Sequence, residues 1–226
     1  MIITQERLDY LMSEDAFETE EIALLHGTST EMVLKMLETG KLPTGITNVT
    51  KDLEILLKNH PTTNNYLYFF ANKEAFANHP FYNQITHRKN ELKLFENATF
   101  YAGENEMESY LRNLLGFWSY DLGIEEALER IYCEGDWDLL QKQGINTQKI
   151  KEYGINKLLR ELKQLKGTVL GINLKALELP IEDGSDAPGE ETMIYLPKGL
   201  DIKYIGYIQI NGEYEKRKLA EFVKLL

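Results

Sequence analysis

The feature that most constrains this chain is a short apolar run near its start, Ile22 to Leu25, which ends in a polar corner. Four consecutive apolar residues bounded by polar ones predict a buried strand, and the pattern that follows is helical. The corner reads His26-Gly27-Thr28. An imidazole therefore stands where the strand ends, and a glycine lets the backbone approach a neighbour closely. We take this corner as the first candidate site.

Further strands are predicted toward both ends of the chain. Tyr66 to Ala71 is short, aromatic and preceded by asparagines, which is typical of a strand. Later strands are expected at 167–174, 192–196 and 202–210, with a closing helix over 213–226. Ala98 to Tyr101 also favours a strand, whereas residues 104–166 have an almost wholly helical pattern. This order predicts one α+β domain over 1–226, with a helical insertion at 104–166.

The charge of the chain is uneven. Its net charge of −11 argues against a surface that is basic all over and binds nucleic acid by charge alone. Residues 139–166 nevertheless hold seven basic and two acidic residues, with leucines and bases on different faces of the expected helix. The simplest interpretation of this segment is a solvated helix face.

The chain has one cysteine, Cys133, which excludes a disulfide framework and a zinc cluster of cysteines. We expect Cys133 to be a small buried residue on a helix. The first 21 residues carry acids and lack the continuous apolar core of a signal peptide. No apolar run approaches the roughly 18 residues that a membrane helix needs. These features favour a cytoplasmic protein that has no membrane partner.

Three segments of the chain, taken together, resemble one enzyme family. His26 to Thr28 is similar to the first motif of the poly(ADP-ribose) polymerase-like, His-Tyr-Glu group of ADP-ribosyltransferases. Leu67 to Asn78 resembles that group's Tyr-Phe-Ala strand and the Ala-Asn helix after it. Glu191 to Tyr195, followed by Lys203-Tyr204, looks like its catalytic-glutamate strand. The resemblance implies a split antiparallel β-sheet core of the ADP-ribosyltransferase type.

The resemblance also implies roles for individual residues, with NAD as substrate and no metal. His26 is expected to bind a ribose hydroxyl of NAD, and the Gly27 backbone to pair with the nicotinamide carboxamide. Thr28 completes that motif, and Tyr68 forms an aromatic wall for the nicotinamide ring. Glu191 is expected to hold the nicotinamide ribose and to stabilise positive charge at its anomeric carbon.

Two positions leave the assignment open. His79 stands where the family usually places a second stacking tyrosine, so either His79 stacks or Phe81 or Tyr82 reaches in. Glu190 competes with Glu191 for the catalytic role, and strand alternation points the two to opposite faces.

The function implied by the resemblance is mono-ADP-ribosyl transfer from NAD to a macromolecule, as in many bacterial and phage toxins and defence proteins, some of which are held by an inhibitory antitoxin-type partner. The acidic loop 178–190 favours a basic protein acceptor, whereas the basic residues of 142–166 favour RNA or DNA. An NAD glycohydrolase and a non-catalytic binding module are the alternatives. A 2′-phosphotransferase is disfavoured because Arg88, Arg112, Arg130 and Arg160 lie outside the three motifs.

Overall fold

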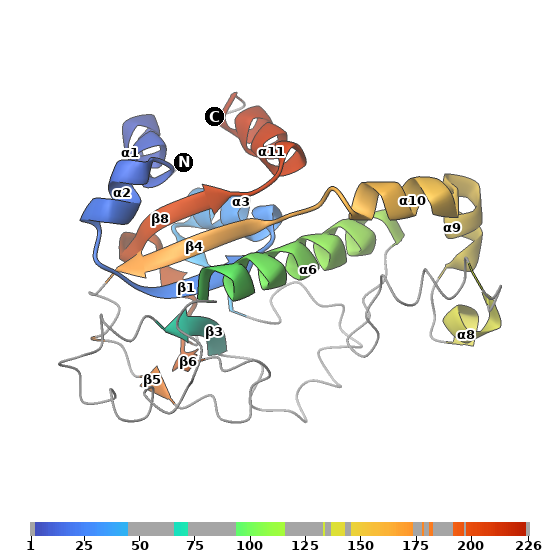
Figure 1. The fold of residues 1–226 in the computed structure, drawn as a ribbon, viewed down its shortest axis with the longest axis horizontal. Helices are drawn as coiled ribbons and strands as arrows, with labels where there is room; N and C mark the ends of the chain where they lie inside the picture. The colour runs from blue at the N-terminus through green and yellow to red at the C-terminus, as the bar shows by residue number, and fades with distance from the viewer. Residues whose placement is uncertain are drawn as a thin grey trace.

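The fold combines helices with an antiparallel sheet, which is the α+β class expected from the sequence. The computed structural model describes residues 3–44, 66–71, 94–115, 133, 137–142, 146–173, 178, 181–182, 192–196 and 198–224. The main sheet has the spatial order β5-β6-β3-β1-β4-β8, so β1 from the start of the chain lies between strands that come much later (Figure 1). Its strands are β1 (Ile22–Thr28), β3 (Tyr66–Ala71), β4 (Thr168–Asn173), β5 (Ile181–Glu182), β6 (Thr192–Tyr195) and β8 (Ile205–Ile210).

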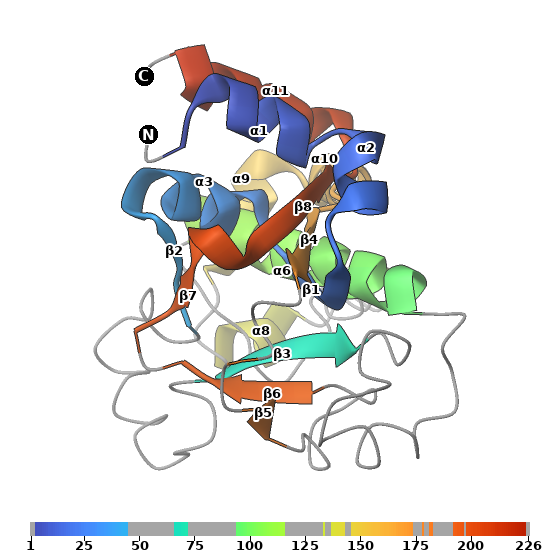
Figure 2. The same cartoon turned by 90° about the vertical axis from the view of Figure 1, so that its left-hand side faces the viewer.

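The join between β1 and β3 is narrow. The two strands are paired at Leu24↔Ala71 and Leu25↔Phe70, whereas β4 pairs with β1 along its whole length, from Ile22 to Thr28. On its other edge β3 pairs with β6, and β6 pairs with β5. The sheet therefore has two parts, β5-β6-β3 and β1-β4-β8, and Figure 2 shows β3, β6 and β5 gathered below the rest.

Helices cover both faces of the sheet. The helices on the sheet are α1 (Gln5–Leu11), α2 (Glu14–Thr19), α3 (Thr30–Thr39), α6 (Leu94–Leu115) and α11 (Glu213–Lys224). Beyond the sheet, α8 (Trp137–Lys142), α9 (Thr147–Tyr153) and α10 (Ile155–Leu162) pack against one another and against the far half of α6. A small two-stranded sheet pairs β2 (Lys41–Leu42) with β7 (Leu200–Asp201), and a 3-10 turn, Ile202–Tyr204, precedes β8. α3 begins where the Ser29 side chain accepts a hydrogen bond from Met32 N–H, and it ends at Gly40, whose φ is 78°.

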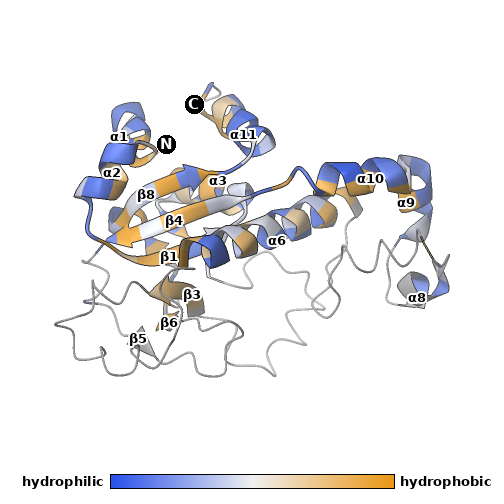
Figure 3. Ribbon diagram, viewed as in Figure 1, coloured by the Kyte–Doolittle hydropathy of each residue, from blue (hydrophilic) through white to orange (hydrophobic). Residues whose placement is uncertain are grey.

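Three groups of buried side chains hold these layers together. The largest lies between the sheet and α1, α3 and α11, and it includes Leu8, Leu24, Met36, Phe69 and Leu219. A second lies between the opposite face and α6, formed by Leu25, Phe70, Ala98, Ala102 and Val169. A third joins the far half of α6 to α9 and α10 through Leu111, Ile150, Leu158, Leu162 and Leu165. Figure 3 shows hydrophobic colours along β1 and β3 and hydrophilic colours over much of α9 and α10.

The expectation of a strand at Ala98 to Tyr101 is wrong, because these residues belong to the 22-residue helix α6. Ala98 and Ala102 are buried four residues apart against β1, while Phe100 is 62% exposed. The segment thus follows helical spacing, and its aromatic residues misled the sequence interpretation. α6 starts at Leu94 and continues through residue 104, so the expected boundary of the insertion falls inside a helix.

Cys133 lies at a helical position and is exposed, so the expectation that it is buried is wrong. A thiol buries little apolar surface, and a single exposed one therefore costs the fold little. In the described ranges no helix is both long and apolar enough to cross a membrane.

Candidate functional site

His26 lies where β1 and β3 part. Its Nδ1 atom is 2.8 Å from the Tyr68 carbonyl oxygen, and its ring centroid is 5.4 Å from that of Phe69. A carbonyl oxygen only accepts hydrogen bonds, so Nδ1 carries the proton and donates it. The neutral ring therefore presents an unprotonated Nε2. The backbone of β3 thus fixes both the tautomer and the orientation of His26.

The environment of His26 favours the neutral ring. Removal from water lowers the pKa of the imidazole below its ordinary value, and the hydrogen bond to the Tyr68 carbonyl offsets this only in part. Nε2 has no hydrogen-bond partner among the residues that the structure describes. A neutral, oriented acceptor of this kind suits a hydroxyl donor, such as a sugar hydroxyl, better than an anion.

Gly27 is held under α6. A Cβ on Gly27 would lie 2.2 Å from the Ala98 carbonyl oxygen and 2.6 Å from Ala102 N, so the helix backbone leaves no room for any side chain. The Gly27 carbonyl accepts a hydrogen bond of 3.1 Å from Asn105 Nδ2. Helix packing therefore accounts for the glycine without any ligand.

Tyr68 meets His26 through its backbone. Side chains alternate along β3, with Phe69 in the core toward α3 and Phe70 in the core toward α6. The half-buried Tyr68 side chain shares the face of Phe70, while the His26 ring contacts Phe69 on the other face. The ring next to the imidazole is therefore that of Phe69. Phe69 follows Tyr68 directly in the sequence but was not among the predicted site residues.

Three of the expected site residues, Glu191, His79 and Tyr82, lie outside the described residues. What the structure fixes is the strand that begins directly after Glu191 in the sequence. Thr192, the first residue of β6, pairs with Phe69, and Met193 pairs with Tyr68. β6 therefore runs beside the same two residues of β3 that contact His26.

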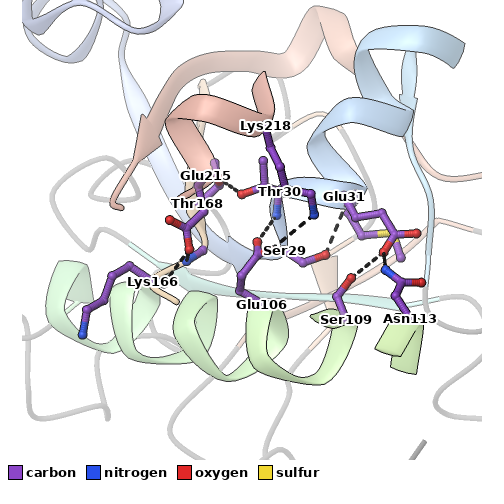
Figure 4. Close-up of polar contacts among 12 residues, drawn as sticks. Ser29, Thr30, Glu31, Glu106, Ser109, Asn113, Lys166, Thr168, Glu215 and Lys218 are labelled. Carbon is purple, nitrogen blue, oxygen red and sulfur yellow. Dashed lines mark hydrogen bonds and ion pairs between the residues drawn. The ribbon is translucent and has the colours of Figure 1, made fainter. Parts of the chain in front are cut away.

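Thr28 ends β1 next to a buried polar network that includes Thr30, Glu106 and Thr168 (Figure 4). It is buried and pairs with Thr168 of β4. Just beyond it, Thr30 N–H donates to Glu106 Oε2 at 2.5 Å, and Thr30 Oγ1 lies 3.1 Å from Thr168 Oγ1. Thr28 is therefore part of the framework that holds the corner.

Glu106 connects this corner to two helices. It stands on α6, accepts at the start of α3, and pairs with Lys218 of α11, whose Nζ lies 3.6 Å from Glu106 Oε1. Burial raises the pKa of the Glu106 carboxyl, and the Thr30 N–H and the Lys218 ammonium oppose that rise. Asn105 and Glu106, neighbours on α6, thus hold the two ends of the corner. One sequence signal for Glu106 is that it continues the four-residue spacing of the buried Ala98 and Ala102.

A second buried carboxylate, Glu215 of α11, holds the start of β4. Its Oε1 accepts from Lys166 N at 2.6 Å and from Gly167 N at 3.0 Å. Glu31 of α3 also bonds across to α6, accepting from Ser109 and from Asn113 Nδ2. These bonds are structural, since each joins one element to another around the corner at β1 (Figure 4).

Within the described ranges, no group of three or more His, Cys, Asp or Glu side chains could hold a metal ion. The arrangement at His26 instead supplies an oriented acceptor and a neighbouring aromatic ring. Comparison of the chain with models of protein families, with curated proteins and with solved structures finds no match.

Proposed function

We propose that this chain is an ADP-ribosyltransferase with a split antiparallel sheet, which cleaves the nicotinamide–ribose bond of NAD and transfers ADP-ribose to a macromolecular acceptor. The observation that carries the proposal is the placement of His26 at the point where the two parts of the sheet diverge. There β1, β3 and β6, the strands that hold or adjoin the three motif segments, are consecutive neighbours in the sheet.

The chemistry needs few groups. Loss of nicotinamide leaves an oxocarbenium-like ribose, which a nearby carboxylate stabilises electrostatically. Glu191 supplies that carboxylate in the proposal. The unprotonated Nε2 of His26 accepts a hydrogen bond from a ribose hydroxyl of NAD. The bond from C1 of the ribose to the nicotinamide nitrogen breaks, and the acceptor nucleophile forms a new bond to C1 and loses its proton.

The test is nicotinamide release from NAD by wild type and by Glu191→Gln, with Glu190→Gln as the matched control. We expect Glu191→Gln to lose at least about a hundredfold in rate, because a carboxylate at developing charge is worth that much or more. Glu190→Gln is expected to stay within a few-fold of wild type. Equal losses in both variants, or no release by wild type, would contradict the assignment.

The acceptor is tested in the same reaction. Free ADP-ribose as the sole product identifies an NAD glycohydrolase, in which water is the acceptor. ADP-ribose bound to a macromolecule identifies a transferase. A wild-type protein that binds NAD without consuming it identifies a binding module.

A further inference from the structure

The segment formed by α9, α10 and the turn that follows α10 is strongly basic. It carries six exposed basic side chains, Lys149, Lys151, Lys157, Arg160, Lys163 and Lys166, which we call the basic face. Residues 146–166 also hold two acids, Glu152 and Glu161, so the formal charge of this segment is +4 in a chain of net charge −11. The basic face is therefore a local exception on an acidic protein.

The buried leucines of α10 lie on the side of the helix away from its basic residues. Leu158 and Leu162 of α10 are buried against α6, on the side of α10 away from Lys157 and Arg160. None of the six basic residues forms an ion pair in the part of the chain that the structure describes. These charges are available to a partner.

The nearby acid Glu161 is occupied by the protein itself. Its Oε2 accepts from the Tyr110 hydroxyl at 2.6 Å and from the Tyr153 hydroxyl at 2.5 Å. The Lys157 ammonium lies over the Tyr153 ring at 4.2 Å, and the Lys151 ammonium over the Trp137 ring at 4.7 Å. Half-buried aromatic rings thus lie directly beside the lysines.

The basic face leads to the candidate site. α10 spans about 12 Å and continues through Gly167 into β4, whose first residue pairs with Thr28. A Cβ on Gly167 would lie 2.9 Å from the Thr28 carbonyl oxygen, so the two segments are in direct contact there. Lys166, which precedes Gly167, therefore lies beside the end of β1. That end is Thr28, two residues after His26 in the sequence. Figure 1 shows α9 and α10 extending away from the sheet.

We propose that the basic face binds the phosphate backbone of a nucleic acid, and that nucleic acid is the acceptor for ADP-ribose. The second clause rests on the proposed function, whereas the first does not. Repeated point charges along α9, α10 and the turn that follows match a row of phosphates, and the aromatic rings among the cations suit unstacked bases.

An acidic protein fits the same surface less well. Protein interfaces are enriched in exposed aromatic residues at their centre and depleted in lysine. The large hydrophobic side chains that are exposed in the described ranges are Phe17 and Phe100, and neither lies on α9 or α10. The basic face offers lysines where a protein partner needs an apolar centre.

Binding is measured with the full chain and labelled 20-mers of single-stranded RNA, single-stranded DNA and duplex DNA, without NAD, from about 50 to 200 mM salt. The test variant is Lys157→Glu/Arg160→Glu/Lys163→Glu. The control reverses three exposed lysines elsewhere, Lys41→Glu/Lys198→Glu/Lys224→Glu, and so changes the net charge equally. Thermal melting of all three proteins verifies that each is folded.

We expect wild type to bind at least one of the three probes. The test variant should bind it at least tenfold more weakly, with a salt slope smaller by about 2 to 3, since each neutralised phosphate contributes about 0.7 to 0.9. The control should stay within about threefold of wild type, because its charges lie away from the bound backbone. Equal weakening of both variants, or binding of polyglutamate but of no nucleic acid, would overturn the proposal.

The acceptor clause has its own readout. Protein incubated with NAD labelled in the ADP-ribose moiety and with the bound oligonucleotide should yield label that nuclease removes and protease does not. Label that only protease removes overturns the acceptor clause and leaves NAD cleavage standing. Absence of nicotinamide release by wild type contradicts the proposed function and with it the acceptor clause, whereas the binding clause is decided by the oligonucleotide measurement, which uses no NAD.

Discussion

The Nδ1 atom of His26 donates a hydrogen bond to the Tyr68 carbonyl across the narrow join between β1 and β3. The bond ties the orientation of the imidazole to the backbone of the neighbouring strand. Burial lowers the pKa of this imidazole, so folding is coupled to its proton.

The first prediction concerns pH. Because the pKa of His26 is lowered in the folded protein, the unfolded chain takes up a proton at this imidazole at a higher pH than the folded protein does, near pH 6.5. His26 therefore contributes stability above that pH, and the contribution falls by at most about 1.4 kcal/mol per pH unit below it. Urea denaturation at pH 8 and pH 5.5 measures the loss. His26→Gln should reduce the difference between the two pH values, and an unchanged difference would assign it to other groups.

The second prediction concerns the close approach of β1 and α6. Gly27→Ala should cost about 1–3 kcal/mol, because the new Cβ meets helix backbone that cannot rotate away. Gly103→Ala, on α6 itself, is the matched control. Its Cβ would make ordinary contacts at 3.8 and 3.9 Å, and alanine is the better helix former by up to about 1 kcal/mol. Urea midpoints should move in opposite directions, and equal shifts would contradict this packing.

Gly27 also illustrates how far the sequence could predict the site. A glycine at this position is equally consistent with the close approach of a ligand and with the close approach of a helix, and the sequence does not say which of the two comes near. That ambiguity depended on Ala98 to Tyr101, whose aromatic residues favour a strand locally. Once this segment is part of helix α6, Ala98 and Ala102 place that helix against the glycine. Long-range packing overrode local preference.

Other parts of the fold could be predicted because their signals are local. The apolar run from Ile22 to Leu25 predicts a strand from residues within a few positions, and β1 extends that strand to Thr28. The contact of His26 with Phe69 was not predicted, because it depends on where two strands separate. Asn105 and Glu106 were not predicted either, because the residues that they contact at the corner are more than 70 positions away in the sequence.

The third prediction concerns Glu106, which is fully buried and accepts from Thr30 N–H beside the Lys218 ammonium. Glu106→Ala should destabilise the fold by about 3–5 kcal/mol, because it leaves the buried Thr30 N–H and the Lys218 ammonium without their shared partner. Adding Lys218→Met should recover part of that loss. Chemical denaturation of the single and double variants measures the coupling, and strictly additive losses would contradict the ion pair.

The last prediction concerns Glu108 on α6, whose carboxyl has a pKa raised to about 7 by burial and then by the neighbouring Glu104 carboxylate. A raised folded-state pKa means that the folded protein binds the proton more tightly than the unfolded chain. The protonated carboxyl is therefore the stable form in the fold. Its contribution is complete below about pH 4.3 and is lost as pH rises through about 7.

Glu108→Gln keeps the shape of the protonated side chain and removes the charge. We expect it to raise stability at pH 8 by about 1–3 kcal/mol, or roughly 2–10 °C in melting temperature for a chain of this size, and to change little at pH 5. The exposed Glu221→Gln on α11 is the control and should change little at either pH. Differential scanning calorimetry at both pH values measures the melting temperatures of wild type and of the two variants. Equal gains at pH 5 and pH 8 would show that the charge of Glu108 is not the cause, because only the ionised form is penalised by burial.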